Sequence, residues 1–163
     1  MNEMQRANRI LCHKSWRAAA AQIAAHEENR KFCRHNIDHL LHVARLACLE
    51  NLERDLEISK ELIYSAALLH DIGRGRQYME GIPHEEAGAV MAASILDDCG
   101  FDETEKEKIL DAGRSHRNRA VSCEDTLRGL IYRADKLSRN CFACAAESEC
   151  SWAQEKKNLY LVR

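Results

Sequence analysis

The sequence predicts an all-α protein, and three features of its composition and pattern indicate this. The chain has 163 residues but only one proline and seven glycines, so few residues interrupt helices. Residues that favour helices, such as alanine, leucine, glutamate, lysine and arginine, are frequent. Apolar residues recur at spacings of three and four, and no segment alternates as a strand would. We therefore expect a bundle of about six to seven helices.

The first half of the chain divides into three expected helices. The first covers residues 3–27, with an Ala-rich stretch, and a break follows near residues 29–34. The second covers residues 36–51, where apolar side chains fall at helical spacing. The third runs from Ser59, a suitable N-cap, to His70. Glycines at positions 73, 75 and 81 then indicate a loop over residues 72–83.

The second half begins with a helix from Pro83 to about Cys99, which Gly100 ends. A fifth helix is expected over residues 102–115. Ser122 and Asp125 resemble a capping box and predict a sixth helix that runs to about Ser138. A short final helix is expected near Ser151. We expect residues 1–140 to form one helical domain and residues 141–163 to form a short Cys-containing appendage.

The charge balance and hydropathy exclude several classes of partner. The formal net charge is −2, from 24 basic and 26 acidic residues, so no polymer of nucleic acid is expected to bind. No run approaches the 18 apolar residues of a membrane span, and the first residues lack the apolar region of a signal peptide. We expect a cytoplasmic protein with no membrane partner. The oligomeric state is left open.

A histidine–aspartate pair at the end of an apolar helix is the strongest indication of chemistry. His70 and Asp71 follow the apolar run of residues 62–69, and both groups need partners once they are buried. His39, His116 and Asp135 lie near apolar stripes of other expected helices. A lone histidine or aspartate there is usually a hydrogen-bonded core residue. Several helices that each present one predict a metal site inside a bundle.

Three short motifs resemble a known family. These are His39-x-x-x-Val43, Leu68-Leu69-His70-Asp71-Ile72-Gly73 and Tyr132-Arg133-Ala134-Asp135-Lys136-Leu137. They are similar to motifs of the HD superfamily of metal-dependent phosphohydrolases, and the resemblance spans about residues 34–140. It implies an HD-domain helical bundle. It also implies that the metal ligands are His39, His70, Asp71 and Asp135.

The number of metal ions depends on two further histidines, His84 and His116. Both look like the additional ligands of two-metal HD proteins, in which the aspartate of the doublet bridges the ions. The alternatives are a solvent-facing residue at a helix start for His84 and a helix C-terminal cation for His116. Imidazole and carboxylate ligands suit one or two ions of Mn²⁺, Fe²⁺, Co²⁺, Ni²⁺ or Zn²⁺.

Two branches of the superfamily fit this chain less well. HD-GYP proteins, which hydrolyse cyclic di-GMP, carry paired histidines where this chain has Ser115-His116, and their Gly-Tyr-Pro element is absent. Five-prime nucleotidase members place a catalytic acid three residues beyond the doublet, where this chain has Arg74. Neither activity is assigned.

The resemblance implies a phosphohydrolase, acting as a phosphomonoesterase or a phosphodiesterase. The substrate class would be a small phosphorylated metabolite such as a nucleotide, attacked at phosphorus by metal-activated water. Asp71 would accept the proton. Phosphoryl transfer also needs cations, and Arg74, Arg117 and Lys136 each adjoin or lie close to an expected ligand. A solvated surface role is the alternative for these three.

Four cysteines have the spacing of a thiolate metal site. Two residues separate Cys141 from Cys144, Cys150 follows, and Cys33 precedes His39 by as many positions as Cys141 follows Asp135. The site would hold Zn²⁺ or an iron–sulfur cluster. The alternative is a set of free thiols. The cysteines also suggest a second function, a non-catalytic metal- or redox-sensing HD module.

Overall fold

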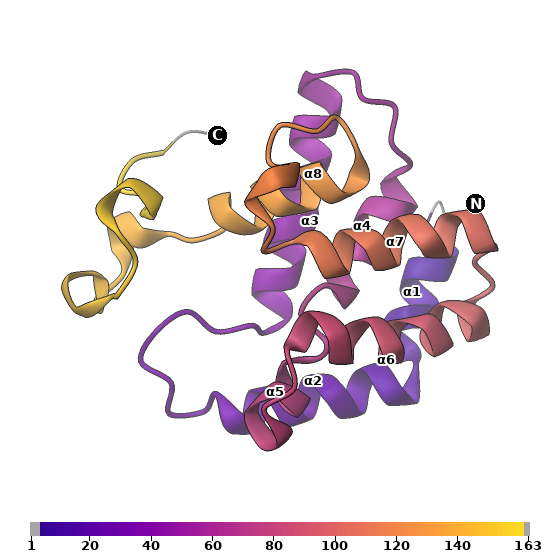
Figure 1. The fold of residues 1–163 in the computed structure, drawn as a ribbon, viewed down its shortest axis with the longest axis horizontal. Coiled ribbons are helices and arrows are strands. Elements are labelled where there is room, and N and C mark those ends of the chain that lie inside the picture. The colour runs from indigo at the N-terminus through magenta and orange to yellow at the C-terminus, as the bar shows by residue number, and fades with distance from the viewer. Residues whose placement is uncertain (1–3, 162–163) are drawn as a thin grey trace.

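The structure is a computed structural model that describes residues 4–161, and Figure 1 shows its fold. Its α-helices are α1 (Gln5–Cys12), α2 (Lys14–His26), α3 (Ile37–Glu53), α4 (Lys60–Leu69), α5 (Arg74–Glu80), α6 (His84–Cys99), α7 (Glu103–Ser115) and α8 (Leu127–Leu137). No strand occurs within residues 4–161, and the predicted all-α class is confirmed. Residue 3, where the first helix was expected to begin, lies outside the described residues.

The prediction of a single first helix is wrong, because the chain forms two helices there. His13 separates α1 from α2 with an extended backbone, at φ −68° and ψ 130°. Its ring nitrogen Nδ1 accepts a hydrogen bond of 3.2 Å from the backbone N–H of Ser15, so His13 caps α2. No proline or glycine marks this break. The chain turns there through side-chain capping, which periodicity does not detect.

Three more boundaries differ from the sequence prediction. The expected loop over residues 72–83 contains the helix α5. Its glycines do not interrupt that helix, because Gly73 and Gly81 cap its two ends and Gly75 lies in its first turn. The sixth helix starts at Leu127 instead of Ser122, and Thr126 caps it by accepting from the backbone N–H of Gly129. Near Ser151 the chain forms only a short 3₁₀ turn, η4 (Gln154–Lys156).

The core is built where α3 packs against α4 and α8, and where α7 packs against α6 and α8. Its most buried side chains are branched aliphatics such as Ile63, Leu68, Leu130 and Ile131. Trp16 of α2 covers one end of α4, where its indole N–H donates to the carbonyl oxygen of Leu68 at 2.9 Å. These contacts fix the end of α4, where the histidine–aspartate pair lies.

Gly73 lets α6 approach the end of α4 closely. A Cβ placed on Gly73 would lie 2.1 Å from the carbonyl oxygen of His84 and 2.4 Å from the backbone nitrogen of Gly88. Only glycine leaves room for this backbone contact. The start of α6 is thereby held against the residues that follow α4.

Residues 141–161 lie to one side of the bundle, as Figure 1 shows in yellow. They form only 3₁₀ turns, namely η2 (Cys141–Ala143), η3 (Glu147–Glu149) and η4. Elsewhere a further turn, η1 (Arg119–Val121), precedes α8. Within the described part of the chain, no helix combines the length and the apolar character that crossing a membrane requires.

Candidate metal centre

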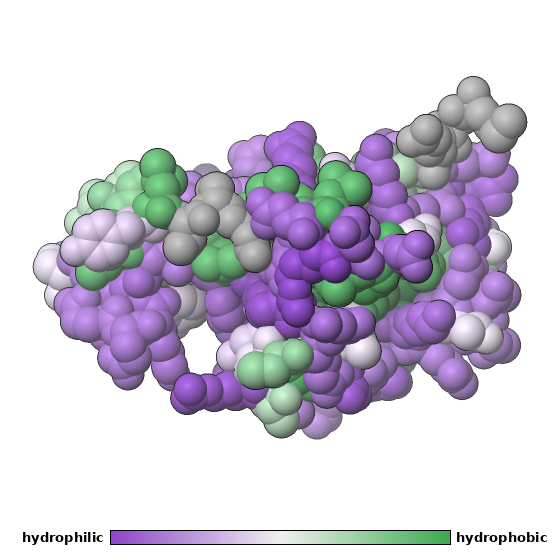
Figure 2. Space-filling view, turned by 90° about the horizontal axis from the view of Figure 1, so that it is seen from above, coloured by the Kyte–Doolittle hydropathy of each residue, from purple (hydrophilic) through white to green (hydrophobic). Residues whose placement is uncertain are grey.

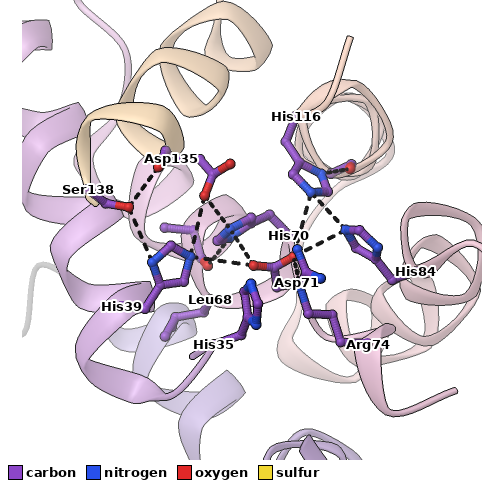
Figure 3. A network of polar contacts seen from close by, with 12 residues as sticks. His35, His39, Leu68, His70, Asp71, Arg74, His84, His116, Asp135 and Ser138 are labelled. Carbon is purple, nitrogen blue, oxygen red and sulfur yellow. Dashed lines mark hydrogen bonds and ion pairs between the residues drawn. The ribbon is translucent and has the colours of Figure 1, made fainter. Parts of the chain in front are cut away.

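Five helices bring six buried histidines and aspartates to one place, which Figure 3 shows. His39 lies in the first turn of α3, the pair His70 and Asp71 follows α4, and Asp135 lies near the end of α8. His84 begins α6 and His116 follows α7. Their ligand atoms form two groups, each within 4.8 Å, composed of His39, His70, Asp71 and Asp135 and of Asp71, His84 and His116.

Asp71 belongs to both groups because its two oxygens face in different directions. Oδ2 lies 3.1 Å from Nε2 of His70 and 3.4 Å from Nε2 of His39. Oδ1 lies 3.3 Å from Nε2 of His84 and 3.6 Å from Nε2 of His116. A carboxylate in this position can touch two cations at once, one through each oxygen.

Each of the four histidines turns Nε2 toward the centre because an oxygen atom holds its Nδ1. Nδ1–H of His70 donates to the carbonyl oxygen of Ala67 at 2.7 Å, and Nδ1–H of His116 donates to that of Gly113 at 2.6 Å. The side chain of Gln77 holds His84 in the same way at 2.7 Å. A carbonyl only accepts, so these Nε2 atoms carry lone pairs that suit a metal.

His39 is oriented by Ser138, which is one turn from Asp135 on α8. The Ser138 hydroxyl donates to the carbonyl oxygen of Asp135 at 2.7 Å and so accepts from Nδ1 of His39 at 3.3 Å. The imidazole lone pair at Nε2 then faces Oδ1 of Asp135 at 3.4 Å. The same helix therefore supplies a carboxylate and the group that orients the opposite histidine.

The polar atoms at the centre fit a cation better than they fit one another. Nε2 of His70 and Oδ2 of Asp71 are buried without a hydrogen-bond partner. Nε2 of His84 and Nε2 of His116 face each other at 3.0 Å, although both are acceptors. Burying unpaired polar groups is costly, and a divalent ion at each group would satisfy all of these atoms.

The pKa values of the two aspartates are consistent with that charge pattern. Burial alone would raise them, but the neighbouring histidines outweigh burial and hold the pKa of Asp71 and of Asp135 well below the ordinary range. Burial would lower the pKa of His70, but the two aspartates outweigh burial and raise it to about 10, so without an ion Nε2 of His70 carries a proton that a metal ion would replace. The centre therefore attracts cations strongly.

The structure places the three expected cations at different depths. Arg74, 18% exposed, donates from Nε to Oδ1 of Asp71 at 2.8 Å. Lys136, 36% exposed, donates to Oδ2 of Asp135 at 2.7 Å and to the carbonyl oxygen of His116 at 3.2 Å. Arg117 is 56% exposed and lies 3.5 Å from a carboxylate oxygen of Glu85, away from the two aspartates. Of these three expected cations, only Arg74 and Lys136 touch the proposed ligands.

Sequence reasoning missed Arg139, which lies against the centre. Arg139 is buried, and its guanidinium lies 3.4 Å from Oδ1 of Asp135 and 3.5 Å from Nε2 of His39. It and Ser138 follow Asp135 by four and three residues, so helical spacing alone could have placed both near that aspartate. Adjacency in sequence favoured Lys136 instead.

The centre opens into a cavity of about 630 Å³. His39, His84, His116 and Asp135 line its floor together with Arg74, and Arg117 and Lys136 also border it. The four cysteines of the predicted thiolate site border the same cavity, and all are free thiols. Among residues 4–161, only the two His/Asp groups bring three or more ligand atoms within 4.8 Å.

Comparison with known proteins assigns the family. The HD-domain family model matches residues 36–140, most of the chain, and the protein belongs to that family. An uncharacterised protein of Clostridium beijerinckii is 46% identical over 132 residues, which cover 81% of this chain and 82% of that protein. The bifunctional uridylyltransferase/uridylyl-removing enzyme of Vibrio atlanticus is 32% identical over 112 residues, covering 64% of this chain but 12% of that enzyme.

A solved structure shares the fold. The crystal structure of a predicted HD superfamily hydrolase from an uncultured Thermotogales bacterium superimposes with a TM-score of 0.65 at 23% identity. The match covers 90% of this chain and 80% of the other. Family membership and the two His/Asp groups, which could each hold a divalent metal, together support a metal-dependent hydrolase.

Proposed function

We propose that the protein is a metal-dependent phosphohydrolase acting on a small phosphorylated metabolite such as a nucleotide. The observation that carries this proposal is the pair of ligand groups that share the buried Asp71 and whose other members include four residues that line an open cavity. Two such groups suit one or two divalent ions, with Mn²⁺, Fe²⁺, Co²⁺, Ni²⁺ and Zn²⁺ as the candidates. When bound, the ions lower the pKa of water and neutralise charge on phosphoryl oxygens.

The charge of the cavity favours an anionic substrate. Basic side chains dominate its wall and include Arg30, Arg34, Arg74, Arg117, Lys136 and Arg139. The acids in the same wall are Asp38, Asp135 and Glu147. A volume of about 630 Å³ is within the range of sites for small molecules of nucleotide size. Phosphate groups would enter toward the cations and reach the floor.

Individual residues have separate roles in this proposal. Asp71 accepts the proton of the attacking water, since Arg74 stands where related enzymes carry an acid. Arg74 and Lys136 are partly exposed cations that contact the aspartates and also border the cavity, so they bind phosphoryl oxygens. Arg117 lies farther out and contributes to substrate binding at the entrance.

The proposal is tested by phosphate release from a panel of nucleoside monophosphates and by p-nitrophenol release from bis(p-nitrophenyl) phosphate, with Mn²⁺, Co²⁺ or Fe²⁺ added. We expect release with the wild type, and a loss on the order of a thousandfold with Asp71→Asn, which keeps the shape but removes the charge. Glu107→Gln, which neutralises an exposed carboxylate on α7, is the matched control. The monoester and diester substrates distinguish the two subclasses.

The result against the proposal is equal release by wild type and Asp71→Asn on every substrate and metal. A variant of Lys136, Lys136→Met, separates the roles further. Loss of a phosphoryl contact lowers kcat/KM, whereas a purely supporting role toward Asp135 weakens metal binding first. Measuring KM for substrate and the metal requirement of the same variant distinguishes these two cases.

A further inference from the structure

Four cysteines from distant parts of the sequence border one side of the cavity. Cys33 lies in the segment between α2 and α3, and the others lie in residues 141–150 beyond α8. Both segments line the cavity, and Figure 2 shows an opening in the surface beside the lobe that lies to one side of the bundle. None of the four thiols is part of the His/Asp groups described above.

Polar contacts hold these two segments together. The ammonium of Lys31, two residues before Cys33, lies 2.5 Å from a carboxylate oxygen of Glu149, which precedes Cys150. Arg30 donates to the carbonyl oxygen of Cys33 at 2.8 Å and shapes the same loop. The chain therefore brings Cys33 and Cys150 to one cavity, although 116 residues separate them in sequence.

The three cysteines after α8 lie in a backbone turn that is repeated every three residues. The backbone N–H of Cys144 donates to the carbonyl of Cys141, that of Glu147 to Cys144, and that of Cys150 to Glu147, at 3.1 Å each. Asn158 fastens the segment to α8 by donating from its side chain to the carbonyl oxygen of Lys136 at 2.7 Å. The backbone of the three cysteines is thus held in one regular series of turns that is attached to α8.

This segment is ordered without a hydrophobic core of its own. Between residues 141 and 161, Ala146 is the one buried apolar residue. A piece of about twenty residues that buries so little apolar surface needs a cross-link or a metal to hold it. Its cysteines form no disulfides among the described residues. A metal held by thiolates would supply the missing link.

A nearly buried lysine adds positive charge beside the thiols. The side chain of Lys157 is 4% exposed and donates to the carboxylate and the carbonyl oxygen of Glu147 at 2.7 and 2.9 Å. Lys157 borders the same cavity as the four cysteines. An ammonium here stabilises thiolate, which is the form that binds metal.

We propose that Cys33, Cys141, Cys144 and Cys150 together bind a thiolate-ligated metal group, separate from the ions of the His/Asp centre. The site joins the segment between α2 and α3 to the chain beyond α8 and so forms one wall of the cavity. It is structural in this proposal, and the phosphohydrolase chemistry does not depend on electron transfer through it.

The separation of the thiols favours an iron–sulfur cluster over a single zinc ion. Four thiolates around Zn²⁺ lie about 3.8 Å apart, from a zinc–sulfur bond of about 2.3 Å. No three of these sulfurs, among the described residues, come within 4.8 Å of one another. A four-iron cluster is wider than one ion and keeps its thiolates farther apart. We therefore assign the site to an iron–sulfur cluster.

Metal and sulfide analysis of the full chain tests both parts of the proposal. The protein is purified without oxygen or added metal and assayed for iron, zinc, acid-labile sulfide and visible absorption. We expect about four sulfides per chain. Sulfide identifies the cluster because ions of the His/Asp centre carry none. Cys33→Ser, Cys141→Ser, Cys144→Ser and Cys150→Ser each should lose it, while Cys12→Ser and Cys123→Ser, which change exposed thiols, should not.

Alkylation of the native protein gives a readout that does not depend on variants folding. We expect Cys12 and Cys123 to react with iodoacetamide roughly tenfold faster than the four proposed ligands, because thiolates bound to metal are protected. If the protein contains zinc but no sulfide, and each of the four substitutions removes that zinc, the thiolate site would stand and the iron–sulfur cluster would be overturned. Equal alkylation of all six thiols, with metal content unchanged by the four substitutions, would overturn the site itself.

Discussion

Replacing Gly73 by alanine should damage the protein in a specific way. The added Cβ would lie 2.1 Å from the carbonyl oxygen of His84 and 2.4 Å from the backbone nitrogen of Gly88. Ordinary contacts are about 3.4 Å or longer, so α6 would have to retreat by about 1 Å. The φ angle of Gly73 is −78°, which alanine adopts freely, so the whole cost is steric.

The cost can be worked from that contact. Both clashing atoms belong to backbone, which yields less than a side chain, so we place the loss near the top of the overpacking range, at about 3 kcal/mol. For a chain of 163 residues this lowers Tm by about 6–12 °C. The retreat also moves His84 from Oδ1 of Asp71, now 3.3 Å away. Metal affinity should fall most in the group with His84.

Thermal unfolding and calorimetric titration with Mn²⁺ measure the two effects. Gly113→Ala is the matched control, because the nearest atom to a Cβ there is 4.0 Å away and alanine favours the helix. We expect Gly73→Ala to lose one class of Mn²⁺ site and keep the other. A Tm for Gly73→Ala within about 2 °C of wild type, which corresponds to about 1 kcal/mol or less, would refute the packing role of this glycine.

Two further outcomes follow from polar groups near the centre. Burial, partly offset by Glu27, lowers the pKa of His35 to about 4, so the free energy of unfolding should fall by roughly 2–3 kcal/mol as pH drops from 6.5 to 4, where the unfolded state alone binds the proton. Urea unfolding across that range checks this, and His35→Gln should flatten the profile. Arg139→Gln removes a cation 3.4 Å from Asp135, so Mn²⁺ should bind roughly tenfold tighter while turnover falls. Weaker Mn²⁺ binding would mean that Arg139 positions Asp135.

The sequence predicted the composition of the centre better than the path of the backbone. His39, His70 and Asp135 lie on apolar stripes of long helices, where spacing of three and four places a residue reliably. The structure brings all three to Asp71. The break at His13 was missed, because capping by a side chain leaves the apolar pattern unchanged on both sides.

The missed features share a physical cause. Arg74 was expected to bind substrate, but its contact with Asp71 depends on α5, which three glycines had concealed. Arg139 was overlooked because cations were sought next to a ligand in the sequence, whereas Arg139 lies one helical turn after Asp135. Spacing in sequence did select cysteines that border one cavity, yet it could not give the distances between their sulfurs. Those distances depend on contacts between segments, such as Lys31 with Glu149.

The bonds that orient His70 and His116 also complete the ends of two helices. Each ring donates to the carbonyl oxygen three residues earlier, in the last turn of α4 or α7, where main-chain acceptors lack helical partners. Fraying of either end would therefore release a histidine from the centre. Ion binding opposes that fraying and stabilises the folded state by about 2.7 kcal/mol at a hundredfold excess over Kd. Amide hydrogen exchange in the last turns of α4 and α7 would therefore slow as the centre fills.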